Sequence, residues 1–259
     1  MRDGWRLAAG TLTALPTRPP SRVDAGVARS CVLLAPLAVL PLGIGVALVG
    51  LATVALDARP LVGAFLALGL LALGTRVLHW DGLSDTVDGL TASYDPERSL
   101  AVMKSGTSGP AGVVATVVVA GIQAAALAAL FTSAGGAVLA GLAVLLSRCA
   151  LSLTCRRGVQ PARRDGLGHP LAGVVPTGAT LAQWGAGALL LALGCTLLSS
   201  ATPTDVVLVL HGLTAMAVAA ATVLVLVRHC TRRLGGVTGD VYGAGVELAL
   251  AALLVVLSI

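Results

Sequence analysis

"PLVGAFLALGLLALGTRVLHWDGLSDTVDGL", residues 60–90, joins an apolar run directly to an acidic stretch. The apolar part holds a single charge, Arg76, and at about 1.5 Å per residue it is long enough to cross a hydrocarbon core of about 30 Å. The acidic part then carries Asp81, Asp85 and Asp88 within eight residues. The stretch therefore predicts a membrane span that ends beside a polar site.

The rest of the chain has the same apolar character. Of its 259 residues 56% are hydrophobic and 11% are charged, and its mean hydropathy is +0.93, which is far above that of an average soluble domain. Frequent Gly and Ala favour close contact between membrane helices. We predict an all-α fold, a polytopic transmembrane helical bundle that forms a single domain over residues 1–259. Its seven spans are expected at 31–56, 60–78, 110–131, 134–155, 179–200, 205–227 and 241–259.

The basic residues predict how the bundle is oriented. Of the 17 lysines and arginines, all except Arg59 fall on one side of the predicted spans. Because positively charged short loops stay in the cytoplasm, the N-terminus is expected there and the C-terminus outside. Most acidic residues fall on the same side, so we expect the chemistry to face the cytoplasm. The net charge of +5 then reflects topology, helped by anionic lipid and substrate, and requires no nucleic acid.

The three aspartates after the apolar run predict a cation site. If the helix continues through this stretch, Asp81, Asp85 and Asp88 lie at i, i+4 and i+7 on one face. Near a membrane their mutual repulsion is screened incompletely, so a cation is expected among them. Mg²⁺ suits the position, because it binds one or two carboxylates together with waters and phosphate oxygens. The alternative is a solvated acidic loop.

A second polar cluster, "GGVTGDVYGAGVE", occupies residues 235–247. Asp240 and Glu247 are seven residues apart and share a helical face. Glu247 falls about two turns inside the last span, where an ionisable side chain is costly and therefore a functional candidate. We predict both as further metal ligands. The alternative is that Glu247 pairs with an arginine of another helix.

Several basic side chains are candidates for binding phosphate. Arg163 and Arg164 lie in a glycine-containing loop that suits phosphate oxygens, although a cytoplasmic loop carries arginines in any case. Arg148, near the end of the fourth span, either extends to the membrane surface or reaches a phosphate. His79 either binds phosphate or marks the membrane interface.

Six segments resemble the motifs of one family, the cobalamin synthases or adenosylcobinamide-GDP ribazoletransferases. They are "LTALPTRP" (12–19), "HWDGLSDTVDG" (79–89), "VMKSGTSGPAG" (102–112), "SRCALSL" (147–153), "RRDGLG" (163–168) and "LGGVTGDVYGAGVEL" (234–248). They follow the family's order through nearly the whole chain. One departs from the pattern, because the family often has an acidic residue where this chain reads "SGTS" (105–108).

The resemblance implies a Mg²⁺-dependent, multi-pass transferase of the prokaryotic inner membrane, with its active site facing the cytoplasm. Such an enzyme joins α-ribazole, or its phosphate, to adenosylcobinamide-GDP and releases GMP. The implied partners are these two small molecules, the large corrinoid lying in a cavity open to the cytoplasm, and the membrane lipid. Self-association into a homo-oligomer is left open.

This reaction assigns roles to the predicted residues. Attack of an alcohol on a phosphoanhydride asks mainly for charge neutralisation and positioning. Asp81, Asp85 and Asp88 are expected to hold Mg²⁺ across the diphosphate. Asp240 and Glu247 would complete the metal site or supply the base. The residues predicted to be catalytic are Asp240 and Asp88. Substrate binding is predicted for His79, Lys104, Arg148, Arg163 and Arg164.

Two rival interpretations remain. "DTVDGLTAS" (85–93) partly resembles the CDP-alcohol phosphotransferase signature, but Ser93 stands where Arg is expected. Gly106 and Pro110 stand where that signature has two further aspartates. The other rival is a small transporter or ion channel. Against it, the acids gather at one membrane face instead of the midplane, and the sequence has no inverted repeat of broken helices.

Overall fold

The computed structural model describes residues 1–166, 168–198 and 206–259, and the described chain is almost entirely helical. The predicted span ends at 199–200 and at 205 lie outside these ranges. A short 3₁₀ turn, η1 (His169–Leu171), interrupts the longest described loop. The helices are α1 (Arg2–Leu12), α2 (Ala25–Ala38), α3 (Leu40–Ala55), α4 (Pro60–Gly74), α5 (Leu78–Ala92), α6 (Pro96–Met103), α7 (Pro110–Leu130), α8 (Ala134–Ser147), α9 (Ala150–Thr154), α10 (Thr177–Leu198), α11 (Val206–Leu234) and α12 (Gly239–Leu257).

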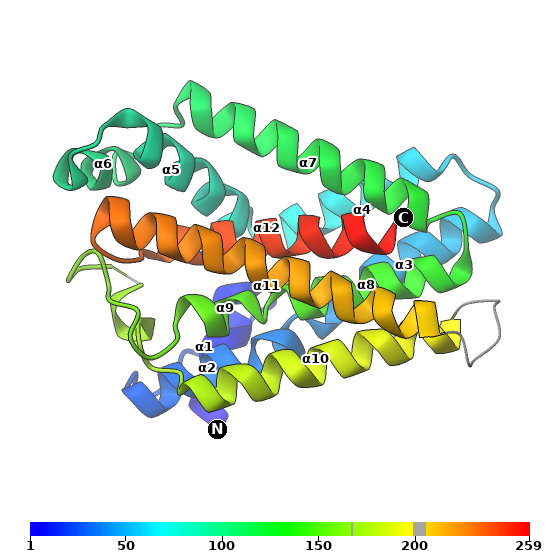
Figure 1. Cartoon of the computed structure of the whole chain (residues 1–259), viewed down its shortest axis with the longest axis horizontal. Helices are drawn as coiled ribbons and strands as arrows, with labels where there is room; N and C mark the ends of the chain where they lie inside the picture. Colours follow the sequence, from blue (N-terminus) through cyan, green and yellow to red (C-terminus); the bar gives the residue numbers. More distant parts are fainter. Residues whose placement is uncertain (167, 199–205) are drawn as a thin grey trace.

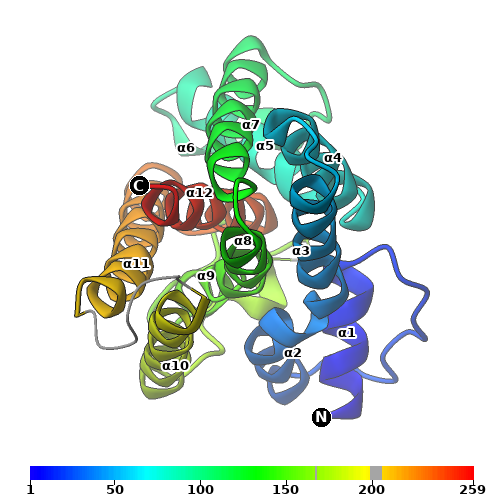
Figure 2. The same ribbon diagram turned by 90° about the vertical axis from the view of Figure 1, so that its right-hand side faces the viewer.

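The long helices form one bundle around α8 and α12. Seen end-on, these two lie in the middle, with α2, α3, α7, α10 and α11 around them (Figure 2). Most residues of α12 and of the α8–α9 segment are buried, whereas the surrounding helices expose large apolar side chains. Among the described residues, six helical segments are long and apolar enough to cross a membrane, or seven if the bent pair α4 and α5 is one span. The chain is therefore the predicted polytopic, all-α bundle.

Small residues let the central helices approach closely. A Cβ atom added to Gly141 of α8 would lie 2.5 Å from the carbonyl oxygen of Gly43 in α3, well inside van der Waals contact. The two backbones therefore touch where they cross. Lipid tails are as apolar as leucine, so close packing of this kind is a main source of attraction between membrane helices.

Polar connections collect at one end of the bundle. In Figure 1 the left-hand end holds α5, α6, the loop after α9 and the C-terminal end of α11. The opposite end holds the α3–α4 connection, which carries Arg59, and the C-terminus. The arginines of the α9–α10 loop and of α11 thus share one end, as the charge pattern predicts. That this end faces the cytoplasm stays a prediction.

The second span does not run on as one straight helix into the acidic stretch. Helix α4 ends at Gly74, and α5 restarts at Leu78 with an axis turned by 89°. Arg76 and Val77 between them have φ angles of 55° and 61°. This left-handed conformation is uncommon for non-glycine residues and costly for β-branched ones, so surrounding contacts must hold it. One such contact is the hydrogen bond from Arg76 Nη2 to the carbonyl oxygen of Gly10 in α1, at 2.6 Å.

The far end of α5 is held by α11. Arg233 donates hydrogen bonds to the carbonyl oxygens of Leu90 (3.1 Å) and Ser93 (2.6 Å), which lie at the C-terminus of α5. Its guanidinium also lies 4.3 Å from the centre of the Tyr94 ring. A cation is favourable at a helix C-terminus because unpaired carbonyls gather there. The acidic helix is therefore fixed at both ends by residues of other helices.

We predict that the α3–α8 contact is sensitive to a single added methyl group. Gly141→Ala should lower the free energy of unfolding by about 1–3 kcal/mol, because the backbones must separate. Gly121→Ala in α7 is the matched control, since no atom lies within 4 Å of its added Cβ. Thermal unfolding in detergent measures both. Equal melting temperatures for the two variants would contradict the described contact.

Candidate functional site

A cavity of about 360 Å³ opens at the polar end of the bundle. It lies where α1, α2, α5, α9 and α12 meet the 163–171 segment. The predicted site residues that line it are His79, Asp81, Lys104, Arg163 and Asp240. These residues are far apart in sequence, and the fold alone brings them together. Arg164 is exposed and is not among the lining residues, and neither is Arg148.

The three aspartates of α5 lie one turn apart but in three different environments. Asp81 is exposed at the cavity, Asp85 is partly buried, and Asp88 is buried. The negative charges of Asp81, Asp240 and Asp88 all act on the Asp85 carboxylate, and Arg163 opposes them. The predicted cluster of like charges is therefore present around Asp85, with an arginine beside it.

Two glycines allow α5 and α12 to bring these acids together. A Cβ atom on Gly82 would lie 2.7 Å from the Asp240 carbonyl oxygen, and one on Gly243 would lie 3.1 Å from the Cα of His79. Backbone therefore touches backbone at this crossing. Any larger side chain would push the acidic helix away from Asp240.

Asp240 is held by two partners. Arg163 Nη2 donates to Asp240 Oδ2 at 3.2 Å, and the Thr238 hydroxyl donates to the same oxygen at 3.0 Å. Thr238 also caps α12 by accepting from the Val241 amide. The loop that carries Arg163 is anchored close by, because the amide of Ala162 donates to the Val237 carbonyl at 2.9 Å. This backbone contact therefore holds the Arg163 guanidinium beside Asp240.

A second ion pair lies at the rim of the cavity. Lys104 Nζ lies 2.7 Å from Asp165 Oδ2, and both side chains are largely exposed. The bond to Lys104 holds the pKa of the Asp165 carboxyl below its ordinary value. Exposed ion pairs of this kind contribute little to stability, so the pair can open at little cost.

Asp88 faces α7 instead of the cavity. Its Oδ2 accepts from the Gly109 amide at 2.6 Å, and its Oδ1 accepts from the Gly112 amide at 2.8 Å. Free amides at a helix start favour a carboxylate, so Asp88 caps α7 from a neighbouring helix. Its predicted role as metal ligand and catalytic residue stays untested, but these contacts give both of its oxygens a structural partner.

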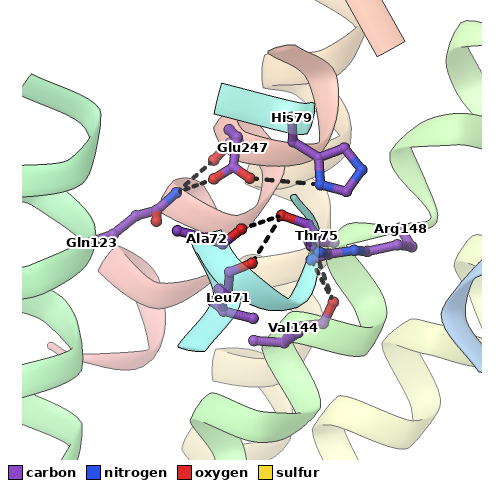
Figure 3. Close-up of polar contacts among 9 residues, drawn as sticks. Leu71, Ala72, Thr75, His79, Gln123, Val144, Arg148 and Glu247 are labelled. Carbon is purple, nitrogen blue, oxygen red and sulfur yellow. Dashed lines mark hydrogen bonds and ion pairs between the residues drawn. The ribbon is translucent and has the colours of Figure 1, made fainter. Parts of the chain in front are cut away.

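Glu247 lies in a separate, buried cluster (Figure 3). Gln123 Nε2 donates to Glu247 Oε2 at 2.9 Å and to its carbonyl oxygen at 3.1 Å. His79 Nδ1 is 3.9 Å from Glu247 Oε1. The charge of the fully buried Arg148 attracts Glu247, and Arg148 Nη1 donates to Val144 and Ser147. Arg148 thus acts on Glu247 only through its charge, without an ion pair within 4 Å, and the cluster separates Glu247 from the other predicted metal ligands.

Sequence reasoning missed several polar residues of the site region, including Asp165, His169, Gln123 and Tyr242. Gln123 is the only residue of α7 with a side-chain amide, and its isolation among apolar residues is the signal that could have identified it. Tyr242 donates from its hydroxyl to the Gly168 carbonyl at 2.9 Å and so ties the 163–168 loop to α12. Nothing in its sequence spacing distinguished it from a core aromatic.

Within residues 1–166, 168–198 and 206–259, no three His, Cys, Asp or Glu side chains form a group that could hold a metal ion. Mg²⁺, however, commonly takes only one or two protein carboxylates and fills its remaining positions with waters and phosphate oxygens. The aspartates near the cavity therefore fit an ion completed by a diphosphate better than an ion held by protein alone.

Comparison with known proteins gives consistent results. A family model described as cobalamin-5-phosphate synthase matches residues 4–258. A protein of Nocardioides sp. named adenosylcobinamide-GDP ribazoletransferase is 57% identical, over 98% of this chain and 97% of its own. Proteins of the same name from Frankia casuarinae and Sinorhizobium medicae are 34% and 37% identical, over 98% of this chain and 93% and 96% of theirs. No solved structure matches.

The two ends of the acidic motif should respond differently to truncation. Asp88→Ala removes the cap of α7 and should lower the free energy of unfolding by about 1–2 kcal/mol. Asp81→Ala, in the same helix but exposed, should leave it unchanged within about 0.5 kcal/mol. Thermal melts of both variants in detergent give the comparison. If Asp81→Ala destabilises the protein as much as Asp88→Ala, the capping role is wrong.

Proposed function

Because the chain belongs to the cobalamin-5-phosphate synthase family, we propose that it joins α-ribazole, or its phosphate, to adenosylcobinamide-GDP and releases GMP. The observation that carries the proposal is the meeting of Asp81, Asp240 and Arg163 at one cavity, with Asp85 close enough to be influenced by all three charges. A CDP-alcohol phosphotransferase and a transporter are not favoured, since the curated relatives carry the transferase name. The membrane is proposed to be the prokaryotic inner membrane, with the cavity facing the cytoplasm.

The proposed reaction transfers the cobinamide phosphoryl group from GMP to a ribose hydroxyl. A ribose hydroxyl oxygen forms a bond to the phosphorus next to the cobinamide. The bond from that phosphorus to the bridging oxygen breaks, and GMP leaves with that oxygen and its electron pair. The hydroxyl proton passes to a base. Phosphodiester replaces phosphoanhydride, so the transfer needs no external energy source.

Each residue at the cavity mouth has a proposed task. Arg163 stabilises the charge that grows on the leaving phosphate, because it lies at the cavity and is positioned by backbone contacts. Asp240, the partner of Arg163 in that ion pair, would accept the hydroxyl proton. Lys104 can leave its exposed pair with Asp165 and bind a non-bridging phosphate oxygen.

Asp81 and Asp85 are the residues that we propose for Mg²⁺, with Asp240 near them. When bound, the ion would neutralise charge on the diphosphate. Asp88 and Glu247 are left out of this smaller set, because α7 amides and Gln123 already engage their oxygens. Arg148 is likewise assigned to the buried cluster instead of the substrate.

Turnover by the purified protein tests the proposal directly. In liposomes with adenosylcobinamide-GDP and α-ribazole, the wild-type protein should form joined product and GMP, both detected by mass spectrometry. Removal of Mg²⁺ with a chelator should stop the reaction, and Asp85→Asn should lower kcat by about 100-fold or more while melting normally. Release of CMP from a CDP-lipid with no corrinoid product would instead support the phospholipid enzyme.

Two adjacent arginines provide a matched pair. Arg163→Gln should reduce kcat by about 10²–10³-fold, because it removes a positioned cation beside the transferred phosphate. Arg164→Gln removes the same charge from an exposed residue outside the cavity lining, so kcat should stay within about threefold of wild type. Steady-state kinetics at saturating substrate separates the two. Similar losses in both variants would show that only the loop's net charge matters.

A further inference from the structure

The lining of the cavity divides into a charged rim and an apolar floor. The rim carries the ion pairs Lys104–Asp165 and Arg163–Asp240, with Asp81 close by. The buried polar side chains of His79 and Thr238 also line the cavity, but most of its floor is made of buried apolar side chains from different helices. They include Leu12 of α1, Val32 of α2, Leu151 of α9, and Cys155, Val237 and Tyr242.

The volume of the cavity decides which of the two proposed substrates it can enclose. About 360 Å³ lies near the lower end of the roughly 300–1,000 Å³ typical of pockets for drug-sized ligands. A nucleoside such as α-ribazole has about that size. A corrin macrocycle with its side chains and a nucleotide tail is several times larger. The cavity can therefore enclose the nucleoside but not the corrinoid.

The polarity of the cavity decides how the nucleoside enters. Its alkylated benzimidazole base is flat and apolar, and its ribose carries the hydroxyls. Burying the base against Leu12, Val32 and Leu151 removes apolar surface from water, which is favourable. The reverse orientation would press unpaired hydroxyls against apolar side chains, at a cost of roughly 1–3 kcal/mol for each unsatisfied group.

We propose that this cavity is the α-ribazole site, with the base on the apolar floor and the ribose at the charged rim. The corrinoid stays outside, and only its diphosphate reaches Arg163 and the aspartates. The ribose hydroxyl and the phosphorus that it attacks then meet at the rim. This inference rests on the proposed function and adds to it which substrate is enclosed.

A matched pair of leucines in α9 tests the site. Leu151 and Leu153 are both buried, each 7% exposed, but only Leu151 lines the cavity. Leu151→Phe should narrow the floor and raise the KM for α-ribazole about tenfold or more, while the KM for adenosylcobinamide-GDP stays within about twofold. Leu153→Phe should leave both values near wild type. A rise in the corrinoid KM alone, or in neither value, for Leu151→Phe would overturn the proposal.

Inhibition of the wild-type protein by free benzimidazole gives a second test that needs no variant. Benzimidazole should compete with α-ribazole and not with adenosylcobinamide-GDP. Competition with the corrinoid instead, or no inhibition at millimolar benzimidazole, would contradict the assignment of the floor to the base.

Failure of the proposed function can be told apart from failure of this inference. If the wild-type protein forms no joined product, the proposed function is wrong. If the wild-type protein turns over normally, but neither Leu151→Phe nor benzimidazole raises the apparent KM for α-ribazole, only the assignment of the cavity is wrong. Equilibrium dialysis of α-ribazole without corrinoid should also show tighter binding to wild type than to Leu151→Phe.

Discussion

The contact between α5 and α12 is the constraint on which the site depends. At Gly82 and Gly243 the two backbones come so close that no side chain fits between them. This crossing requires α5 to turn by 89° away from α4 and to accept two left-handed residues at the corner. The conformational cost of the corner is offset by ties at both ends of α5, from Arg76 to α1 and from Arg233 to the helix C-terminus. Asp81 then faces the cavity, and Asp88 faces the start of α7.

The polar residues of this end divide into two groups with different tasks. Asp81, Asp240 and Arg163 line the cavity, and Asp85 lies near them. Glu247, Gln123 and Arg148 lie beneath them in the bundle and come from α12, α7 and the end of α8 (Figure 3). An ion in this interior is tolerable only when opposite charge and hydrogen bonds accompany it. The hydrogen bonds between Gln123 and Glu247 tie α7 to α12, Arg148 bonds within α8, and His79, which also lines the cavity, lies beside Glu247.

This division explains how an apolar bundle can handle a charged reaction. The charged groups that we propose for the diphosphate stay at the rim, where the cost of desolvation is small. The apolar part of the cavity is free to take an apolar ring. Structural carboxylates such as Asp88 are satisfied by backbone amides, so they do not compete for the same cations.

The sequence by itself determined the fold class, the approximate spans and several of the residues that the fold brings to the cavity. Long apolar runs leave few alternatives to membrane helices, because backbone polar groups in lipid must be satisfied within the helix. The i, i+4, i+7 spacing also predicted that the three aspartates lie on one helix. The tertiary structure decided which of them share an environment, since Asp88 turned to the start of α7 and Glu247 to Gln123. Such choices depend on the corner at Arg76 and Val77 and on backbone contacts between residues more than a hundred positions apart. Local spacing carries no information about those contacts.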